Sequence, residues 1–269
     1  MTQKSKTAKP VAHPPESSLI LPATSALRPH WQRLFMGAIN YLIPDSCCLC
    51  DTLHPQQPRI CSPCLGDLPW QSLHCHQCGL QLSLEENVFD NICGQCLAHP
   101  PNFDRAVMPF DYAYPLNSLI SRFKHQKDQV AGQLLADLLA EHLQDHFACQ
   151  PQAVIPQAIL ATPLHWFRHW RRGYNQSHIL ALACAKALNI PCITGVRRIK
   201  ATPRQQGLKR KQRLKNLKGC FFIPHYLPYE HIALVDDVVT TASTMNELAQ
   251  TAKAKGVKQV DVWALARTQ

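Results

Sequence analysis

Hydrophobic and polar positions divide the chain into a weakly patterned N-terminal part and a C-terminal part in which strand-like and helix-like segments alternate. Short apolar runs predict strands at 105–114 (a strand or a hairpin), 158–161, 192–196, 232–235 and 257–265. Helical spacing predicts helices over 116–147 (two helices with a break near 125–128), 177–188 and 243–255. This alternation is typical of an α/β fold, a parallel sheet with helices on both faces. In such sheets a ligand binds beyond the carboxyl ends of the strands.

The first hundred residues are organised differently. Residues 1–28 are polar and rich in Pro, Ser and Thr, which predicts an unstructured tail. Apolar positions over 31–43 follow helical spacing and predict a short amphipathic helix before a Cys-rich segment. The run His99-Pro100-Pro101-Asn102 marks a boundary. We therefore expect a tail over 1–28, a helix and Cys-rich module over 29–100, and an α/β domain over 101–269.

Composition excludes several classes of protein. With 269 residues, 46% hydrophobic and 17% charged, the chain can bury a sizeable core and is not disordered as a whole. No run approaches the roughly 18 apolar residues that a membrane span needs, so we expect no transmembrane segment. The N-terminal 43 residues do not resemble a signal peptide, which favours a cytoplasmic protein.

The net charge of +10 comes from one segment. The chain has 28 Lys and Arg against 18 Asp and Glu, and ten of the bases lie between Arg197 and Lys218 with no acid among them. Without this basic block the remaining bases and acids balance. Such a block is either a solvated loop or a surface that holds phosphates or nucleic acid.

Eight of the 13 cysteines form four C-x-x-C pairs. Two thiolates at this spacing can bind one metal ion, and two such pairs complete a tetrahedral zinc site. Four pairs therefore predict two structural Zn²⁺ ions, with adjacent and interleaved pairing both open. A disulfide framework is the alternative, but it is typical of secreted proteins. The expected metal ligands are Cys47, Cys50, Cys61, Cys64, Cys75, Cys78, Cys93 and Cys96, and Cys48 is expected to be a bystander.

The most informative segment runs from His231 to Thr244. An apolar strand is followed by Asp236 and Asp237 and by a loop of small residues that opens the next helix. Backbone N–H groups of such a loop, the helix N-terminus and the hydroxyl groups form an anion-binding site. The two carboxylates suit ribose hydroxyls or a Mg²⁺ shared with phosphates. The loop candidates are Val238, Val239, Thr240, Thr241, Ala242, Ser243 and Thr244.

This segment resembles the phosphoribosyl pyrophosphate signature of type I phosphoribosyltransferases, in which Gly often stands at the position of Ala242. Further segments resemble the ComF family over about residues 40 to 267. They are Pro163-Leu164-His165, Arg172-Gly173-Tyr174-Asn175-Gln176, and the spaced set Thr202, Gln205, Leu208, Arg213, Asn216, Gly219 and Phe221. Members join an N-terminal Cys-rich zinc region to a phosphoribosyltransferase-like domain.

The resemblance implies roles for these residues. Asp236 and Asp237 would be the catalytic pair that holds the ribose hydroxyls of phosphoribosyl pyrophosphate, with Mg²⁺, and residues 238–244 would hold its 5′-phosphate. The turn 161–165 would be the pyrophosphate loop, and the basic block would be the flexible catalytic loop. Asn175 and Gln176 would cap the following helix or orient nearby arginines. The pyrophosphate and flexible-loop candidates are Thr162, Pro163, Arg171, Arg172, Gln205, Lys209 and Arg213, with Arg168 beside them.

Two functions stay open at this point. One is a Mg²⁺-dependent phosphoribosyltransferase, a glycosyltransferase, that acts on an unidentified acceptor. The other is a non-catalytic adapter that binds single-stranded DNA and docks on a DNA-uptake or recombination protein through its zinc module. Ten cations exceed what one diphosphate requires, and their density suits single-stranded DNA. The resemblance implies a role in natural competence, DNA uptake or the use of external DNA.

Overall fold

The computed structural model describes residues 46–53, 59–83, 91–150, 152–164, 173–199, 219–223 and 227–269. Residues 44–269 form one compact unit. The tail expected over 1–28 and the helix expected over 31–43 lie outside the described residues.

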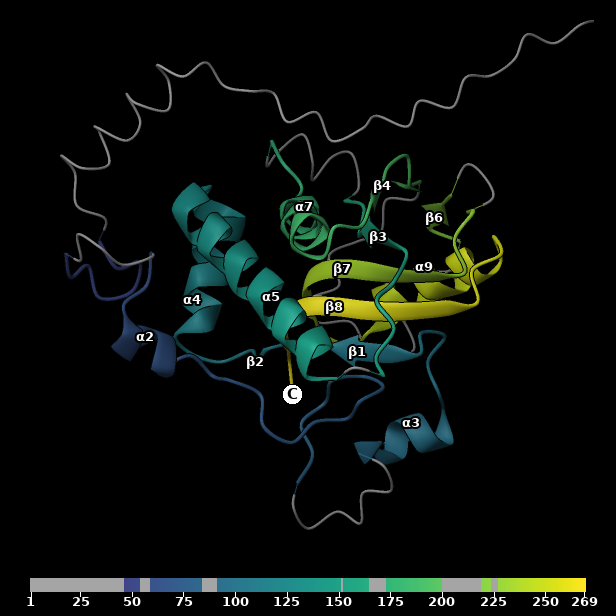
Figure 1. Ribbon diagram of the computed structural model, residues 1–269, viewed down its shortest axis with the longest axis horizontal. Coiled ribbons are helices and arrows are strands. Elements are labelled where there is room, and N and C mark those ends of the chain that lie inside the picture. Colours follow the sequence, from purple (N-terminus) through teal and green to yellow (C-terminus); the bar gives the residue numbers. More distant parts are fainter. Residues whose placement is uncertain are drawn as a thin grey trace, which may run out of the picture. The chain divides into compact units, whose positions relative to one another are not determined.

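A parallel sheet forms the centre of this unit (Figure 1). Its strands are β1 (Arg105–Val107), β2 (Phe110–Asp111), β3 (Ala158–Ala161), β4 (Cys192–Ile193), β7 (His231–Val239) and β8 (Gln259–Arg267). Their order is β1-β8-β7-β3-β4, and β2 also pairs with β8. The long strands β7 and β8 are near-continuous apolar runs, as expected for strands that are buried on both faces. The predicted α/β fold is confirmed.

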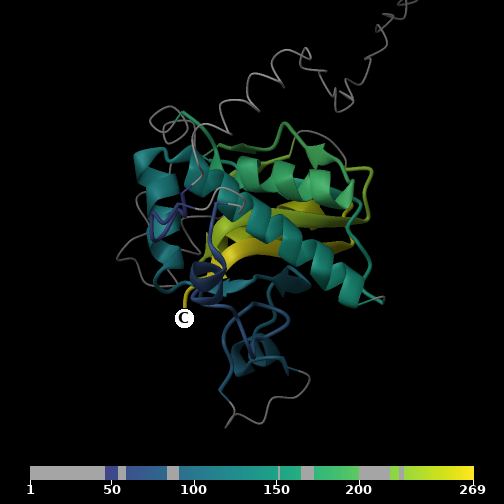
Figure 2. The ribbon, with the colours of Figure 1, turned by 60° about the vertical axis from the view of Figure 1, so that its left-hand side comes forward.

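Helices cover both faces of the sheet (Figures 1 and 2). Ala233 and Val235 of β7 belong to the core formed with α4 (Leu116–Ser121), α5 (Gln129–Cys149) and α7 (Gln176–Leu188). Ile232 and Leu234 belong to the opposite core, formed with α9 (Ser243–Lys253). Alternate residues of one strand therefore face different layers, because side chains of a strand point to opposite faces in turn.

Two segments differ from the sequence prediction in detail. Residues 105–114 form two short strands that both run parallel to β8, so they are not a hairpin. The break expected near 125–128 is present: a π-helical turn, η2 (Arg122–Gln126), ends at Lys127, which has a positive φ of 58°. Asp128 then caps α5, and its Oδ1 accepts a hydrogen bond from the N–H of Ala131 at 3.0 Å. The sequence predicts the break but not the π-helical turn.

The Cys-rich module joins one edge of the sheet through backbone hydrogen bonds. The N–H of Gln71 donates to the carbonyl of Pro109, and the N–H of Asp111 donates to Pro69, both at 2.8 Å. The module contains the short helices α2 (Ser62–Gly66) and α3 (Gly94–Ala98). Cysteines of its first half belong to the core of α5 and α7, and those of its second half to the core of α9. The two halves therefore pack in the cores on opposite faces of the sheet.

A small antiparallel ribbon carries the basic block. It consists of β5 (Arg197–Arg198) and β6 (Phe221–Phe222), and residues 200–218 between them lie outside the described residues. The C-terminal end of this connection is anchored, because Oε1 of Glu247 on α9 accepts a hydrogen bond from the N–H of Gly219 at 2.6 Å. The ribbon is thus joined to α9 next to Gly219.

Candidate functional site

The acid pair lies within β7, not at its end. The sequence predicts a strand over 232–235, but β7 continues to Val239. The reason is that β8 pairs with β7 as far as Val239, whereas the pairing with β3 stops at Ala161 and Val235. Asp236 and Asp237 therefore lie where β3 has ended, at the carboxyl end of the sheet. This is the region in which parallel α/β sheets bind ligands.

Asp236 is held by two hydrogen bonds. Its Oδ1 accepts from Oγ of Ser177, at the start of α7, at 2.8 Å and from the N–H of Asp237 at 3.0 Å. Burial, together with the adjacent charge of Asp237, raises the pKa of Asp236 to about 7. Near neutral pH the pair therefore carries less than two full negative charges.

Lys124 completes this cluster. Its Nζ lies 2.9 Å from Oδ1 of Asp237, and the two side chains are only 21% and 13% exposed. Lys124 lies in the π-helical turn η2, and such turns are frequent at functional sites. Sequence reasoning missed this residue. The sequence shows one sign of it, the break in the helical pattern near residues 125–128.

The predicted phosphate loop connects β7 to α9. Val238 and Val239 belong to β7, while Ser243 and Thr244 begin α9, so the loop proper is Thr240, Thr241 and Ala242. The N–H groups in the first turn of α9 have no acceptor within the helix, and the hydroxyls of Thr241 and Ser243 lie 2.8 Å apart. A small pocket of about 20 Å³ is lined by Asp236 and by Thr240 and Ala242 of this loop. The acid pair and the anion-binding loop are therefore adjacent.

Ala242 has a backbone conformation that favours glycine. Its φ is +55°, in the left-handed region, where a residue with a Cβ is strained by about 1 to 2 kcal/mol. Glycine adopts this conformation without that cost. The substitution by Ala thus falls at a position that needs a positive φ.

The predicted pyrophosphate turn follows β3. The N–H of Thr162 donates to the carbonyl of Val235 at 2.9 Å, which places the turn beside the acid-bearing strand. Asn175 does not cap α7 with its side chain; instead its Nδ2 donates to the carbonyl of Thr162 at 3.0 Å. Oγ1 of Thr162 and Oδ1 of Asn175 are buried and have no hydrogen-bond partner among the residues that the structure describes. Pro163 is buried next to them. Buried polar atoms of this kind are expected to meet water or a ligand.

Several candidate residues lie outside the described residues. They are His165, Arg168, Arg171, Arg172, Gln205, Lys209 and Arg213. Their approach to the acid pair stays a prediction.

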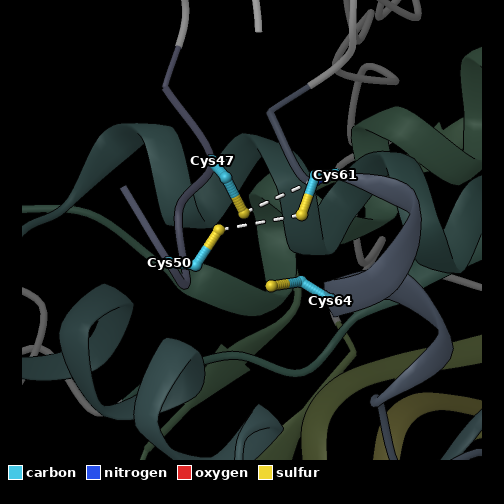
Figure 3. A group of neighbouring side chains, drawn as sticks. All are labelled: Cys47, Cys50, Cys61 and Cys64. Carbon is cyan, nitrogen blue, oxygen red and sulfur yellow. Dashed lines mark hydrogen bonds between the residues drawn. The ribbon is translucent and has the colours of Figure 1, made fainter. Parts of the chain in front are cut away.

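The eight paired cysteines form two clusters, each with four Sγ atoms within 4.8 Å of one another. Adjacent pairs combine, which resolves the pairing that the sequence left open. Cys48 belongs to neither cluster, as expected. The first cluster is drawn in Figure 3. The sets are Cys47, Cys50, Cys61 and Cys64, and Cys75, Cys78, Cys93 and Cys96.

The donor sets fit Zn²⁺. Four thiolates in a closed cluster are the ligands of a structural zinc site. Sγ of Cys47 accepts hydrogen bonds from the N–H groups of Leu49 and Cys61 at 3.5 Å, and Sγ of Cys75 accepts one from Cys93 at 3.3 Å. Such donors stabilise sulfur atoms that carry negative charge. Two Zn²⁺ ions, one per cluster, are therefore consistent with the module.

An arginine of the α/β domain binds each half of the module. Nη1 of Arg122 donates to the carbonyl of Cys48 at 2.5 Å, and Nε of Arg267 donates to the carbonyl of Cys78 at 3.2 Å. The module is therefore attached to the α/β domain by side-chain hydrogen bonds as well as by packing.

A larger cleft of about 620 Å³ is lined by residues of the second cluster and of the predicted phosphate loop, among them Cys78, Cys96, Thr240, Thr241 and Ala242. Within the described ranges, no helix is both long enough and apolar enough to cross a membrane.

Comparison with known proteins finds similarity along most of the chain. A family model described as a double zinc ribbon domain matches residues 38–97. Competence protein F of Haemophilus influenzae is 38% identical over 219 residues, which cover 80% of this chain and 93% of that protein. The DNA utilization protein YhgH of Escherichia coli K12 is 36% identical over 229 residues, covering 84% and 98%.

Solved structures show a more distant likeness. A purine phosphoribosyltransferase from Pyrococcus horikoshii has 15% identity and a TM-score of 0.31, covering 51% of this chain and 85% of its own. A hypoxanthine phosphoribosyltransferase from Trypanosoma cruzi has 16% identity and a TM-score of 0.32, covering 51% and 64%. At these TM-scores the likeness carries no argument about chemistry.

Proposed function

The chain belongs to the ComF family, and we propose that it binds phosphoribosyl pyrophosphate with Mg²⁺ and takes part in competence, DNA uptake or the use of external DNA. The names of its relatives, a competence protein and DNA utilization proteins, support the biological role. The ligand is proposed from the site itself.

One observation carries the ligand assignment: an acid pair with a cation beside it adjoins an anion-binding helix N-terminus. Asp236 and Asp237 would face the ribose hydroxyls, and the loop Thr240–Ala242 with the first turn of α9 would hold the 5′-phosphate. The carboxylate oxygens of the pair are ligands of the kind that Mg²⁺ prefers, and Nζ of Lys124 now lies against one of them, Oδ1 of Asp237. Bound Mg²⁺ would neutralise charge on the diphosphate.

Replacing both acids tests this assignment. We expect Asp236→Asn with Asp237→Asn to weaken the binding of phosphoribosyl pyrophosphate, measured by calorimetry with Mg²⁺, at least about tenfold, because hydrogen bonds to charged groups contribute about 1.5 to 3 kcal/mol. Asp67→Asn, at an exposed acid that ends α2, is the matched control and should bind as the unmodified protein does. Equal affinity of the double variant and the control contradicts the assignment.

Single-stranded DNA is a second candidate ligand, favoured by the ribbon at the base of the basic block. Arg197 pairs with Phe222 across the ribbon, and Phe222 is 46% exposed. The guanidinium of Arg198 lies 5.8 Å from the ring centre of Phe221. An exposed aromatic ring beside arginine is a surface on which bases stack, and the cations of the block would bind the backbone phosphates. In this second proposal the zinc module docks on a DNA-uptake or recombination protein.

Salt dependence tests the DNA candidate. We expect replacement of Lys209, Arg210, Lys211 and Arg213 by Gln to weaken the binding of d(T)20 and to flatten its dependence on log salt by about 0.7 for each lost phosphate contact. Fluorescence anisotropy, measured at salt concentrations from about 50 to about 200 mM, gives both the affinity for d(T)20 and its salt dependence. Lys186→Gln, exposed on α7, is the control outside the block. If the block variant keeps the affinity and slope of the control, the block does not bind DNA.

A further inference from the structure

The ion pair between Lys124 and Asp237 joins two segments that are far apart in the sequence. Lys124 lies in the π-helical turn η2, and Asp237 lies in β7 at the carboxyl end of the sheet. Nζ of Lys124 is 2.9 Å from Oδ1 of Asp237, and both side chains are largely buried. Water and salt therefore screen this ion pair less than they screen a pair at the surface.

The turn that carries Lys124 has anchors of its own. The ring of Phe123 packs against Gly132 of α5, where a Cβ atom would overlap the ring. The carbonyl of Phe123 accepts a hydrogen bond from Oη of Tyr174. These contacts fix the residue next to Lys124 without using its ammonium group. The ammonium group therefore matters for the charge of the acid pair rather than for the position of the turn.

The charges that the described residues bring to the acid pair do not balance with Mg²⁺ alone. Ionised Asp236 and Asp237 carry two negative charges, and Lys124 brings one positive charge to them. A Mg²⁺ ion adds two positive charges, so the pair with Mg²⁺ alone holds one positive charge in excess. Such an excess opposes binding of the free ion, because like charges repel strongly where water is partly excluded. The negative charges of a diphosphate remove the excess.

We propose that Lys124 makes the binding of Mg²⁺ depend on the diphosphate of the ligand. Its ammonium group disfavours the free ion at the acid pair, and it tolerates the ion that comes with phosphoribosyl pyrophosphate, whose charges balance it. Lys124 thereby determines specificity, since it selects a complex of metal and diphosphate over the metal alone. The proposal rests on the proposed function, which puts Mg²⁺ and the diphosphate at the acid pair.

Removing the charge of Lys124 tests the proposal. We expect Lys124→Met to bind Mg²⁺, titrated alone, at least about fivefold more tightly than the unmodified protein does, because the repulsion by the ammonium group is lost. Its affinity for phosphoribosyl pyrophosphate in excess Mg²⁺ should not rise, because the diphosphate balances the ammonium charge there. Calorimetry on the zinc-loaded full chain at pH 8, above the pKa of about 7 of Asp236, measures both affinities. Lys124→Gln is a second variant that removes the charge, with the same expected result.

Lys124→Arg keeps the charge and should bind Mg²⁺ alone as weakly as the unmodified protein does. Lys127→Met is the matched control, because it makes the same change at the exposed end of η2. The proposal is overturned if Lys124→Met and Lys127→Met bind Mg²⁺ alone equally. It is also overturned if Lys124→Met gains as much affinity for phosphoribosyl pyrophosphate in excess Mg²⁺ as it gains for Mg²⁺ alone. Failure of the proposed function has a different signature: no protein in the set would bind phosphoribosyl pyrophosphate, whereas Lys124→Met would still bind Mg²⁺ alone more tightly.

Discussion

Replacing Cys78 by Ser is expected to remove one Zn²⁺ ion per chain and to lower the thermal unfolding midpoint by at least about 10 °C. All four cysteines of its cluster are buried, and they pack in the core that covers the α9 face of the sheet, with Phe103 and Met108. Structural zinc contributes about 10 to 16 kcal/mol in finger peptides, and much of that free energy is free energy of folding. Loss of this ion should therefore destabilise the sheet as well as the module.

The first cluster should tolerate the same change better. Cys50 is exposed and Cys64 is half-buried, so Cys50→Ser uncovers less of the core. We expect both variants to contain about one zinc ion per chain by metal analysis, against about two in the unmodified protein, with the larger fall in midpoint for Cys78→Ser. Differential scanning calorimetry on the zinc-loaded full chain measures the midpoints.

Cys149→Ser is the matched control, since Cys149 is exposed and belongs to neither cluster. It should keep both ions and an unchanged midpoint. One zinc ion per unmodified chain would contradict the two-site assignment. Equal midpoints for Cys50→Ser and Cys78→Ser would instead show that burial of the second cluster does not couple it to the sheet.

The second cluster is also connected to the phosphate loop, through Arg267. This buried side chain donates from Nε to the carbonyl of Cys78 and from Nη1 to the carbonyl of Val239, each at 3.2 Å. Val239 is the last residue of β7, directly before the loop. One buried side chain therefore joins the second half of the module to the strand that leads into the loop.

The eight clustered cysteines could be identified from spacing alone, because C-x-x-C pairs reflect local geometry. How the pairs combine could not, since it depends on which segments meet in space. The position of the two halves in different cores was hidden for the same reason, since it depends on packing against residues that are far away in the sequence. Local patterns therefore predict the C-x-x-C pairs, whereas tertiary contacts determine which pairs combine and where each half packs.

The candidate site shows the same division. Asp236 and Asp237 were found because two acids after an apolar strand are unusual, but the strand was placed too short since its last pairs depend on β8 alone. Lys124 was missed because its partner Asp237 is over a hundred positions away. The positive φ of Ala242 could not be predicted, because alanine rarely adopts a positive φ. Contacts across the sheet, not local propensity, complete the site.

Asp236→Asn alone is expected to stabilise the protein, and more so at pH 8 than at pH 5.5. The carboxyl has a pKa of about 7 in the folded protein, because it is buried and lies beside Asp237, against about 3.9 in an unfolded chain. Between about pH 4 and pH 7 the folded state therefore binds a proton that the unfolded state has released, and stability falls as pH rises through this window. Asparagine does not titrate, so the variant avoids this loss.

We expect the free energy of unfolding, measured with urea in zinc-containing buffer, to favour Asp236→Asn by about 2 to 4 kcal/mol at pH 8 and by about 1 to 2 kcal/mol less at pH 5.5. Oδ1 of the asparagine can still accept from Ser177, so packing is kept. Asp67→Asn, at an exposed acid, should change stability little at either pH. If Asp236→Asn is no more stable than the unmodified protein, or if its gain in stability becomes smaller as pH rises, then the Asp236 carboxylate does not destabilise the folded state.

A variant that gains stability and loses affinity for phosphoribosyl pyrophosphate would identify Asp236 as a residue kept for binding, since folding alone would select against it.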